Sequence, residues 1–276
     1  MQKKIAFFGS GHYTIPIVEK LRNRGLALVV TTEPEGKLTD FLKANNIPLL
    51  YSKLKTPRDI LRIKDLKPDI GILASYGAII PKNVIELFPM GILNIHPSLL
   101  PKYKGPSPIQ YAILDGVQNS GVTIIKLDDQ VDHGPIIAQK PFKLSAKDTL
   151  QNASELMFSV GADMIQEVIQ NIENGLMVKE VSQRIKGESW TQKIDKGNGE
   201  IFIETPPHPA DLDRMIRAFY PWPGVYLSVS LYGKNKILKL LPDNMYQVEG
   251  KKPMSYKDFL NGHGNDAAFI LARLGR

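Results

Sequence analysis

Two hydrophobic periodicities organise the first part of the chain. Short apolar runs that suit buried strands alternate with segments whose apolar residues recur at helical spacing. The expected strands are 4–8, 26–31, 48–51, 69–74 and 91–95, and the expected helices between them are 14–24, 37–45 and 58–66. Strands separated by helices of this length are typical of βαβ units with right-handed crossovers. The pattern therefore predicts an α/β fold with a Rossmann-like parallel sheet.

The pattern changes after the fifth expected strand. The next expected elements are a helix over 108–114 and a hairpin-like pair of strands over 121–127 and 136–142. Apolar residues then recur at helical spacing from Leu150 to Ile172, which predicts one long amphipathic helix that stops at Gly175.

A second unit is expected near the end of the chain. A short helix over 210–219 is followed by alternating apolar residues, from Val225 to Leu240, that predict antiparallel strands around a turn at Gly233. We therefore expect a catalytic α/β domain over residues 1–188 and a small, mainly β domain over 189–276.

Composition narrows the class of protein. The chain has 276 residues, of which 43% are apolar, and it contains no cysteine. Disulfides, thiolate metal sites and a cysteine nucleophile are therefore excluded. The apolar runs are too short for a signal peptide or a membrane span, so we expect a cytoplasmic protein. The net charge of +7, spread over both expected domains, suits a polyanionic partner or an ordinary basic protein about equally well.

The richest candidate chemistry lies where the fifth strand ends. Asn94 and His96 stand two residues apart, so both side chains point to the same side of a strand. Pro97 then ends the strand, at the sheet edge where open α/β sheets bind their ligands. Asp132 lies in a tight Asp-His-Gly-Pro turn that would aim its carboxylate back at the strand ends. An amide, an imidazole and a carboxylate could together move an acyl group onto an amine.

Two other motifs have plainer interpretations. Gly9-Ser10-Gly11, with Glu33 further on, invites a dinucleotide site, but position 14 is threonine where the fingerprint needs its third glycine. A strand-to-helix turn is the better interpretation. The apolar loop 76–81 either closes into a helix or forms one wall for a flat heterocycle.

In combination, these motifs resemble the folate-dependent formyltransferases, which move a formyl group from 10-formyltetrahydrofolate to an amine. The motifs are Asn94-x-His96, the loop Ser98-Leu99-Leu100-Pro101 with Gly105, and Gly121-Val122-Thr123 leading to Asp132-x-Gly134. The resemblance implies that Asn94, His96 and Asp132 are catalytic and that no metal takes part.

Further motifs resemble the methionyl-tRNA formyltransferase branch of this family, from residue 3 to about 262. They are Pro106 to Gln110, Ile216 to Gly224 and Gly250 to Ser255. This branch implies a C-terminal domain built as a partial OB-like barrel, methionyl-tRNA as the acceptor and a role in translation initiation. The single-domain glycinamide-ribonucleotide branch would leave 189–276 unexplained.

The resemblance also implies contacts for each substrate, and no membrane or obligate protein partner. Residues expected to contact folate are Tyr76, Gly77, Ile79, Ile80, Pro81, Ser98, Leu99, Leu100, Pro101 and Asp129. Residues expected to contact tRNA are Lys102, Lys104, Arg214, Arg217, Lys251 and Lys252.

Two departures from the branch keep the acceptor open. Only the acidic loop 32–36 follows the second strand, where the branch usually carries a longer basic insertion. Roughly a hairpin of sequence is also missing between Leu241 and Gln247. The first alternative is therefore an N-formyltransferase acting on a nucleotide-linked amino sugar, and the second is a non-catalytic folate- or nucleotide-binding protein.

Overall fold

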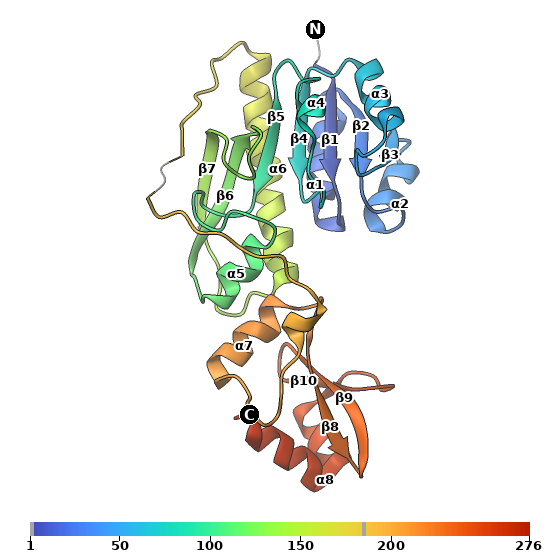
Figure 1. Cartoon of the computed structure of the whole chain (residues 1–276), viewed down its shortest axis with the longest axis vertical. Coiled ribbons are helices and arrows are strands. Elements are labelled where there is room, and N and C mark those ends of the chain that lie inside the picture. Colours follow the sequence, from blue (N-terminus) through green and yellow to red (C-terminus); the bar gives the residue numbers. More distant parts are fainter. Residues whose placement is uncertain (1–2, 184–185) are drawn as a thin grey trace. The chain divides into compact units, whose positions relative to one another are not determined.

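The computed structural model describes residues 3–183 and 186–276 (Figure 1). Contacts divide the chain into two compact units. Unit 1 comprises Met1–Pro106, Asn119–Lys143 and Ser154–Thr191, and unit 2 comprises Ser107–Gln118, Leu144–Ala153 and Gln192–Arg276. The expected division into 1–188 and 189–276 remains a prediction about domains. The contacts differ from it because α5 (Pro108–Leu114) packs on α7 (Pro209–Ala218) in unit 2.

Unit 1 is built on a seven-stranded sheet with the order β3-β2-β1-β4-β5-β6-β7. Its strands are β1 (Ile5–Gly9), β2 (Leu26–Thr31), β3 (Leu49–Tyr51), β4 (Ile70–Ala74), β5 (Ile92–His96), β6 (Asn119–Lys126) and β7 (Ile136–Lys143). The strands from β3 to β5 pair in parallel, which confirms the predicted fold class. The sheet is mixed rather than wholly parallel, because β6 pairs antiparallel with β5 and β7 pairs antiparallel with β6.

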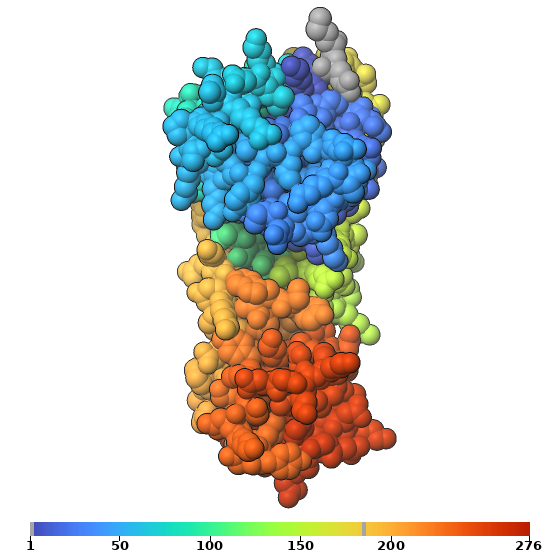
Figure 2. Space-filling model, turned by 90° about the vertical axis from the view of Figure 1, so that its right-hand side faces the viewer, coloured from blue at the N-terminus to red at the C-terminus, as the bar shows by residue number. Residues whose placement is uncertain are grey.

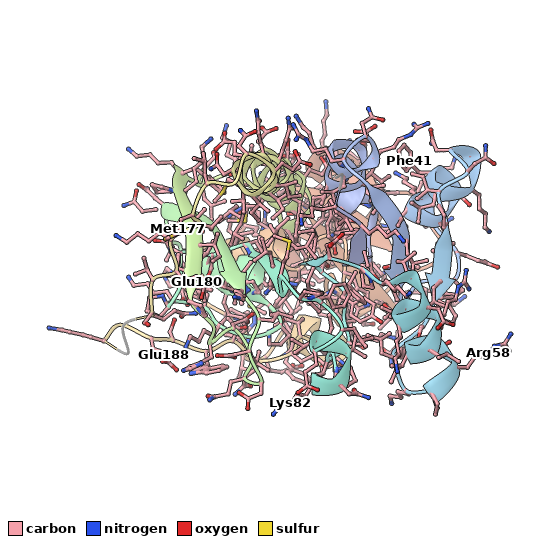
Figure 3. The ribbon with its side chains drawn as sticks, turned by 90° about the horizontal axis from the view of Figure 1, so that it is seen from above. Phe41, Arg58, Lys82, Met177, Glu180 and Glu188 are labelled. Carbon is pink, nitrogen blue, oxygen red and sulfur yellow. The ribbon has the colours of Figure 1, made fainter. Side chains whose placement is uncertain are left out.

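Helices cover both faces of this sheet. They are η1 (His12–Thr14), α1 (Ile15–Arg22), α2 (Lys37–Ala44), α3 (Pro57–Leu66), α4 (Lys82–Ile85) and α6 (Leu150–Glu173), the last beginning in unit 2. Figure 3 shows α1 and α6 on one face, and α4 with Lys82 and α3 with Arg58 on the other. In the described part of the chain, no helix has both the length and the apolar character needed to cross a bilayer.

The sheet of unit 1 forms the centre of its hydrophobic core. Every residue of β1 and of β5 is buried, as expected for strands covered on both faces. On the α3 and α4 side, Phe8 packs edge-on against Tyr76 and Phe88. Figure 2 shows the face of unit 1 on which the segment that includes α2 and α3 lies outermost, in blue to cyan. A rigid, buried β5 fixes the position of the polar side chains at its end.

Unit 2 holds a four-stranded sheet with the order β11-β10-β9-β8. Its strands are β8 (Val225–Leu231), β9 (Lys234–Leu241), β10 (Met245–Val248) and β11 (Met254–Ser255), and its other elements include η2 (Lys196–Gly199) and α8 (Tyr256–Arg273). All described pairings in this sheet are antiparallel, which confirms the predicted antiparallel strands of a small second unit. Helix α8 contacts β8, β10 and β11 and was not predicted from the sequence.

Candidate active site

Strand β5 presents two polar side chains at its carboxyl end. Asn94 and His96 lie opposite Ile125 and Thr123 of β6, and β4 pairs with the other edge of the strand. The strand ends at His96, directly before Pro97, as the sequence predicts. Both side chains are buried, with residue exposures of 8% and 4%. The sheet therefore places an amide and an imidazole on one rigid element.

Asp132 approaches the same point from the loop between β6 and β7. Its backbone is in the left-handed region, with a φ of 48°. That conformation costs roughly 1–2 kcal/mol for a residue other than glycine, so neighbouring contacts must hold it. Gln183 supplies two of these, because its amide donates to the carbonyl oxygens of Asp132 and Gly134 at 2.9 and 2.8 Å. Gly134 is needed because a Cβ there would lie 1.8 Å from the carbonyl oxygen of Lys126.

The three side chains converge. The amide of Asn94 donates to Asp132 Oδ1 at 3.2 Å, and His96 Nδ1 lies 3.5 Å from the same oxygen. Asp132 is itself 8% exposed. One carboxylate oxygen thus faces both groups of β5, as the position of its tight turn predicts.

The loop after β5 contacts this group of side chains through its backbone. His96 Nε2 lies 3.0 Å from the carbonyl oxygen of Tyr103, so this nitrogen must carry the proton of that hydrogen bond. The N–H of Gly105 donates to Asp132 Oδ2 at 2.8 Å. Both imidazole nitrogens therefore face oxygen atoms, which fixes the orientation of the ring.

Thr123 of β6 holds the start of the same loop through hydrogen bonds. The hydroxyl of Thr123 donates to the carbonyl oxygen of Ser98 at 2.6 Å and accepts the N–H of Leu100 at 3.2 Å. Ser98 in turn donates to the carbonyl oxygen of Lys102 at 2.7 Å. These bonds give the loop a defined shape beside His96.

The second segment expected to contact folate is only partly available. Tyr76 is 2% exposed and donates its hydroxyl proton to the carbonyl oxygen of Ser52 at 2.8 Å. Ile80 is also buried, and burial raises the pKa of Tyr76. Both side chains therefore belong to the hydrophobic core, whereas Ile79 is 79% exposed. Of the two possibilities for this loop, the structure favours core packing for Tyr76 and Ile80 and leaves Ile79 as a surface contact.

The residues expected to contact tRNA differ widely in their surroundings. Lys102 is exposed, but Lys104 is 2% exposed and pairs with Glu188 at 3.3 Å. A buried ammonium of this kind is not presented to a phosphate. In unit 2, Arg214 pairs with Asp211, and Arg217 pairs with Asp213 at 2.9 Å. Lys251 and Lys252 are both exposed.

Neither a metal site nor a dinucleotide site is evident. In the described residues, no group of three or more histidine, aspartate or glutamate side chains could hold a metal ion. The N–H of Gly11 donates to Glu33 Oε2 at 3.0 Å, so the carboxylate considered as a ribose ligand instead satisfies the turn after β1. This contact supports the strand-to-helix interpretation of the glycine motif.

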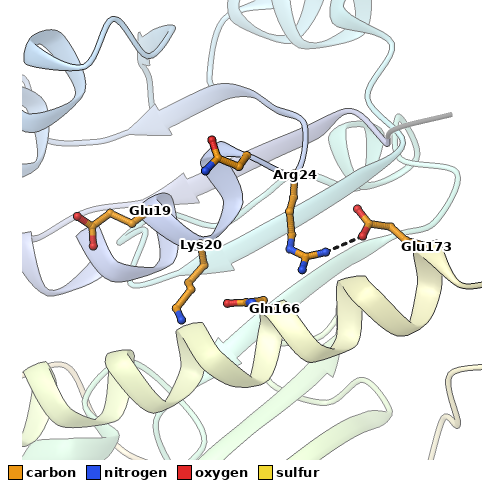
Figure 4. A pocket seen from close by; sticks show the side chains of 6 residues that line it. Glu19, Lys20, Arg24, Gln166 and Glu173 are labelled. Atoms are coloured by element: carbon orange, nitrogen blue, oxygen red, sulfur yellow. Dashed lines mark hydrogen bonds and ion pairs between the residues drawn. The ribbon is translucent and has the colours of Figure 1, made fainter.

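A groove between α1 and α6 is not a better candidate. Its lining is charged, and Figure 4 shows Arg24 joined to Glu173 across it, at 2.7 Å. Lys20 is likewise paired, with Asp163 at 2.9 Å. Both cations that line this groove are therefore paired with carboxylates of the chain.

The sequence did not predict the residues that are distant along the chain but contact the loops of the site. Gln183, Glu188, Ser189 and Thr191 all contact the loops that carry Tyr103, Gly105 and Asp132, although most of these contacts join residues more than fifty positions apart. No local motif marks such contacts, and only the fold reveals them.

Comparison with known proteins identifies the class. Residues 3–169 match the formyl transferase family. The chain is 29% identical to the methionyl-tRNA formyltransferase of Thermodesulfovibrio yellowstonii, over 95% of this chain and 96% of that protein. It is 33% identical to the enzyme of the same name from Roseiflexus castenholzii, over 81% and 75% respectively.

A solved structure agrees at the level of the fold. A sugar N-formyltransferase from a Shewanella species superposes with a TM-score of 0.68 and 15% identity, over 88% of this chain and 99% of that one. The chain belongs to the formyl transferase family, and it is a formyltransferase.

Proposed function

We propose that this protein transfers the formyl group of 10-formyltetrahydrofolate to the amino group of methionyl-tRNA. The observation that carries the chemistry is the convergence of Asn94, His96 and Asp132 at the end of β5, where one carboxylate oxygen lies 3.2 Å from the amide and 3.5 Å from the imidazole. The acceptor is supported by the similarity to methionyl-tRNA formyltransferases, which extends over 95% of the chain and so includes unit 2. An aminoacylated tRNA as substrate implies a reaction in the cytoplasm.

The reaction makes three demands on the site. A neutral amine attacks the formyl carbon, the carbonyl oxygen becomes an oxyanion, and the bond from that carbon to N10 of the folate breaks while a proton passes from the amine to N10. Asn94 uses one amide N–H on Asp132, which leaves its second N–H to stabilise the oxyanion. Removing such a donor typically costs about 2.7–4 kcal/mol of transition-state stabilisation.

His96 is the proton carrier and the second oxyanion donor in this proposal. Asp132 and the Tyr103 carbonyl face its two nitrogens and hold the ring in one orientation. When the hydrogen bond from His96 Nε2 to the Tyr103 carbonyl breaks in favour of the reacting groups, the Nε2 proton is directed at the oxyanion or at N10. Asp132 orients the ring and compensates its charge.

The formyl donor is assigned to the surface between the two loops beside the site. In the loop after β5, Leu99 and Pro101 are partly exposed, whereas Ser98 and Leu100 are buried and belong to the proposal only as support for the loop. Ile79 is the exposed apolar side chain of the loop after β4. An apolar side chain of this kind suits one face of a flat pterin ring. Gly77, Pro81 and Asp129 belong to the same proposal as backbone and rim contacts.

For the acceptor, the basic groups that remain available are Lys102 in unit 1 and Lys251 with Lys252 in unit 2. All three are exposed, and no ion pair joins them to another described residue. Arg214 and Arg217 are already paired with aspartates of their own helix, so their contribution to phosphate binding is smaller.

A second acceptor is favoured by one specific observation. A short acidic loop, residues 32–36, is all that joins β2 to α2, and 88% of the chain resembles a sugar N-formyltransferase in fold. The alternative acceptor is a nucleotide-linked amino sugar. A non-catalytic binding protein is disfavoured, because three reactive side chains meet in one buried cluster.

The test is an incubation with 10-formyltetrahydrofolate and each acceptor in turn. After incubation with methionyl-tRNA, the amino acid is released by mild base and identified by mass spectrometry. N-formylmethionine is the expected product. Formylation of a nucleotide-linked amino sugar, with methionyl-tRNA left unmodified, would establish the alternative instead.

A further inference from the structure

One lysine beside the active site is buried. Lys104 is 2% exposed, although it belongs to a surface loop in which Lys102 is exposed to solvent. Its ammonium lies 3.3 Å from Glu188 Oε2 and 5.4 Å from the centre of the Trp190 ring. Removing an ammonium from water is costly unless a partner compensates it. Burial of the Lys104 ammonium therefore costs free energy, which indicates that the local structure beside the active site depends on the pair with Glu188.

Glu188 is well prepared as that partner. The indole N–H of Trp190 donates to Glu188 Oε1 at 2.6 Å, while the Lys104 ammonium contacts the other carboxylate oxygen. The hydrogen bond from Trp190, and after it the contact with Lys104, lower the pKa of Glu188. The carboxylate is consequently charged at neutral pH.

The backbone strengthens the same connection. We call residues 188–191 the strap. The N–H of Lys104 donates to the carbonyl oxygen of Ser189 at 2.9 Å, and the N–H of Thr191 donates to the carbonyl oxygen of Lys104 at 2.7 Å. Tyr103 donates its N–H to the hydroxyl of Ser189 at 2.8 Å. Gly105 permits this approach, because a Cβ there would lie 2.7 Å from the carbonyl oxygen of Thr191.

Residues 103–105, which bind the strap, also contact the reactive side chains. The Tyr103 carbonyl accepts the proton of His96 Nε2, and the Gly105 N–H donates to Asp132 Oδ2. Lys104 lies between these two contacts in the sequence. Any displacement of Lys104 must therefore move the hydrogen-bond partners of both His96 and Asp132.

From these contacts we infer that Lys104 is a positioning residue for formyl transfer, acting through Glu188 and Trp190 of the strap, and that it does not bind the acceptor. The inference rests on the proposed roles of His96 and Asp132. The strap, more than eighty residues further along the chain, thereby becomes part of the active site. Its effect belongs to the rate of the chemical step, because the loop orients reacting groups without holding either substrate through Lys104.

The test compares kcat and KM, for the donor and for methionyl-tRNA, in three variants and one control. Glu188→Gln leaves Lys104 buried without a counter-charge and is expected to lower kcat by about 10- to 100-fold, since small misplacements of reacting groups have effects of this size. Both KM values should change less than about threefold. Lys104→Arg retains the ion pair and should keep kcat within about threefold of the unaltered protein. Lys43→Met, at an exposed lysine of α2 outside both proposed substrate sites, should leave kcat unchanged.

A double variant separates positioning from folding. Lys104→Met with Glu188→Gln removes both charges and leaves no unpaired ion, so it should fold and show a higher kcat than Glu188→Gln alone. Thermal unfolding checks that each protein is folded at the assay temperature. A Glu188→Gln protein that is folded and keeps its kcat would overturn the inference, as would a loss confined to the KM for tRNA. Failure of the proposed function is distinguishable, because the unaltered protein would then not formylate methionyl-tRNA.

Discussion

The reactive side chains of unit 1 and the basic side chains assigned to the acceptor differ in how their polar groups are satisfied. Asn94, His96 and Asp132 are buried, and each contacts another or a loop backbone. Lys251 and Lys252 are exposed on a turn of unit 2, and no hydrogen bond to another described side chain fixes either ammonium. Preorganised donors suit chemistry, where geometry decides the rate. Solvated cations suit a polyanion, where charge decides affinity and geometry matters less.

The largest expected effect lies in the buried group. His96→Ala and Asp132→Ala should each lower kcat by about 10²- to 10⁴-fold, because each removes a member of the acid–base pair. Donor affinity, measured by fluorescence titration with a folate analogue, should change little. Asp40→Ala, at an exposed carboxylate on α2, is the matched control and should retain full turnover. Near-normal turnover in either active-site variant would remove that residue from the mechanism.

A slightly smaller effect is expected for the amide. Asn94→Ala should lower kcat by about 10²- to 10³-fold, which is the usual loss when an oxyanion donor is removed. The KM for methionyl-tRNA should stay close to its original value, because Asn94 is buried and, of the substrate atoms, contacts only the formyl carbonyl in this account. Steady-state kinetics with both substrates varied would show this. A rise in KM with kcat unchanged would indicate a binding role instead.

Backbone geometry provides the next prediction. Gly134→Ala should destabilise the fold by about 1–3 kcal/mol, as overpacking usually does, because its Cβ would lie 1.8 Å from the Lys126 carbonyl oxygen. The turn that carries Asp132 should shift with it and kcat should fall. Gly262→Ala, whose Cβ would meet nothing within 4 Å, should do neither. Thermal unfolding and the formylation assay are the two measurements.

The smallest effect is expected for the acceptor surface. Lys251→Glu with Lys252→Glu should weaken methionyl-tRNA binding and reduce the slope of log affinity against log salt by about one unit for each phosphate that the lysines no longer neutralise. Folate affinity should be unaffected. Lys43→Glu, at an exposed lysine of α2, controls for net charge. An unchanged salt slope in the double variant would exclude this turn from the tRNA-binding surface.

A similar contrast separates the features that could be predicted from the sequence from those that could not. Asn94, His96 and Pro97 lie in one short motif whose strand periodicity dictates where each side chain points, so the motif alone locates the site. Lys104 could not be interpreted in the same way. A lysine in a loop rich in proline and glycine looks solvated, and its burial depends on Glu188, a residue 84 positions away.

The helices and strands also divide into those that the sequence predicted and those that it did not. Strands β1 to β5 were predicted within a residue or two, because continuous apolar runs between helices are characteristic of a parallel sheet. Helix α8 was missed, because two glycines, Gly262 and Gly264, interrupt its pattern and the backbone at Gly264 leaves the helical region. Tyr76 was expected to contact folate, and the fold buries its side chain. Local periodicity cannot predict which side of a loop the core will cover.

The most direct test of this division of labour uses two acceptors in one assay. Methionyl-tRNA carries the phosphate backbone, whereas methionyl-adenosine offers the same amino group without it. His96→Ala should lose the same factor in kcat/KM on both acceptors. Lys251→Glu with Lys252→Glu should lose activity on methionyl-tRNA and keep it on methionyl-adenosine. Equal losses on both acceptors for the lysine variant would contradict the account, because unit 2 would then be needed for the chemistry itself.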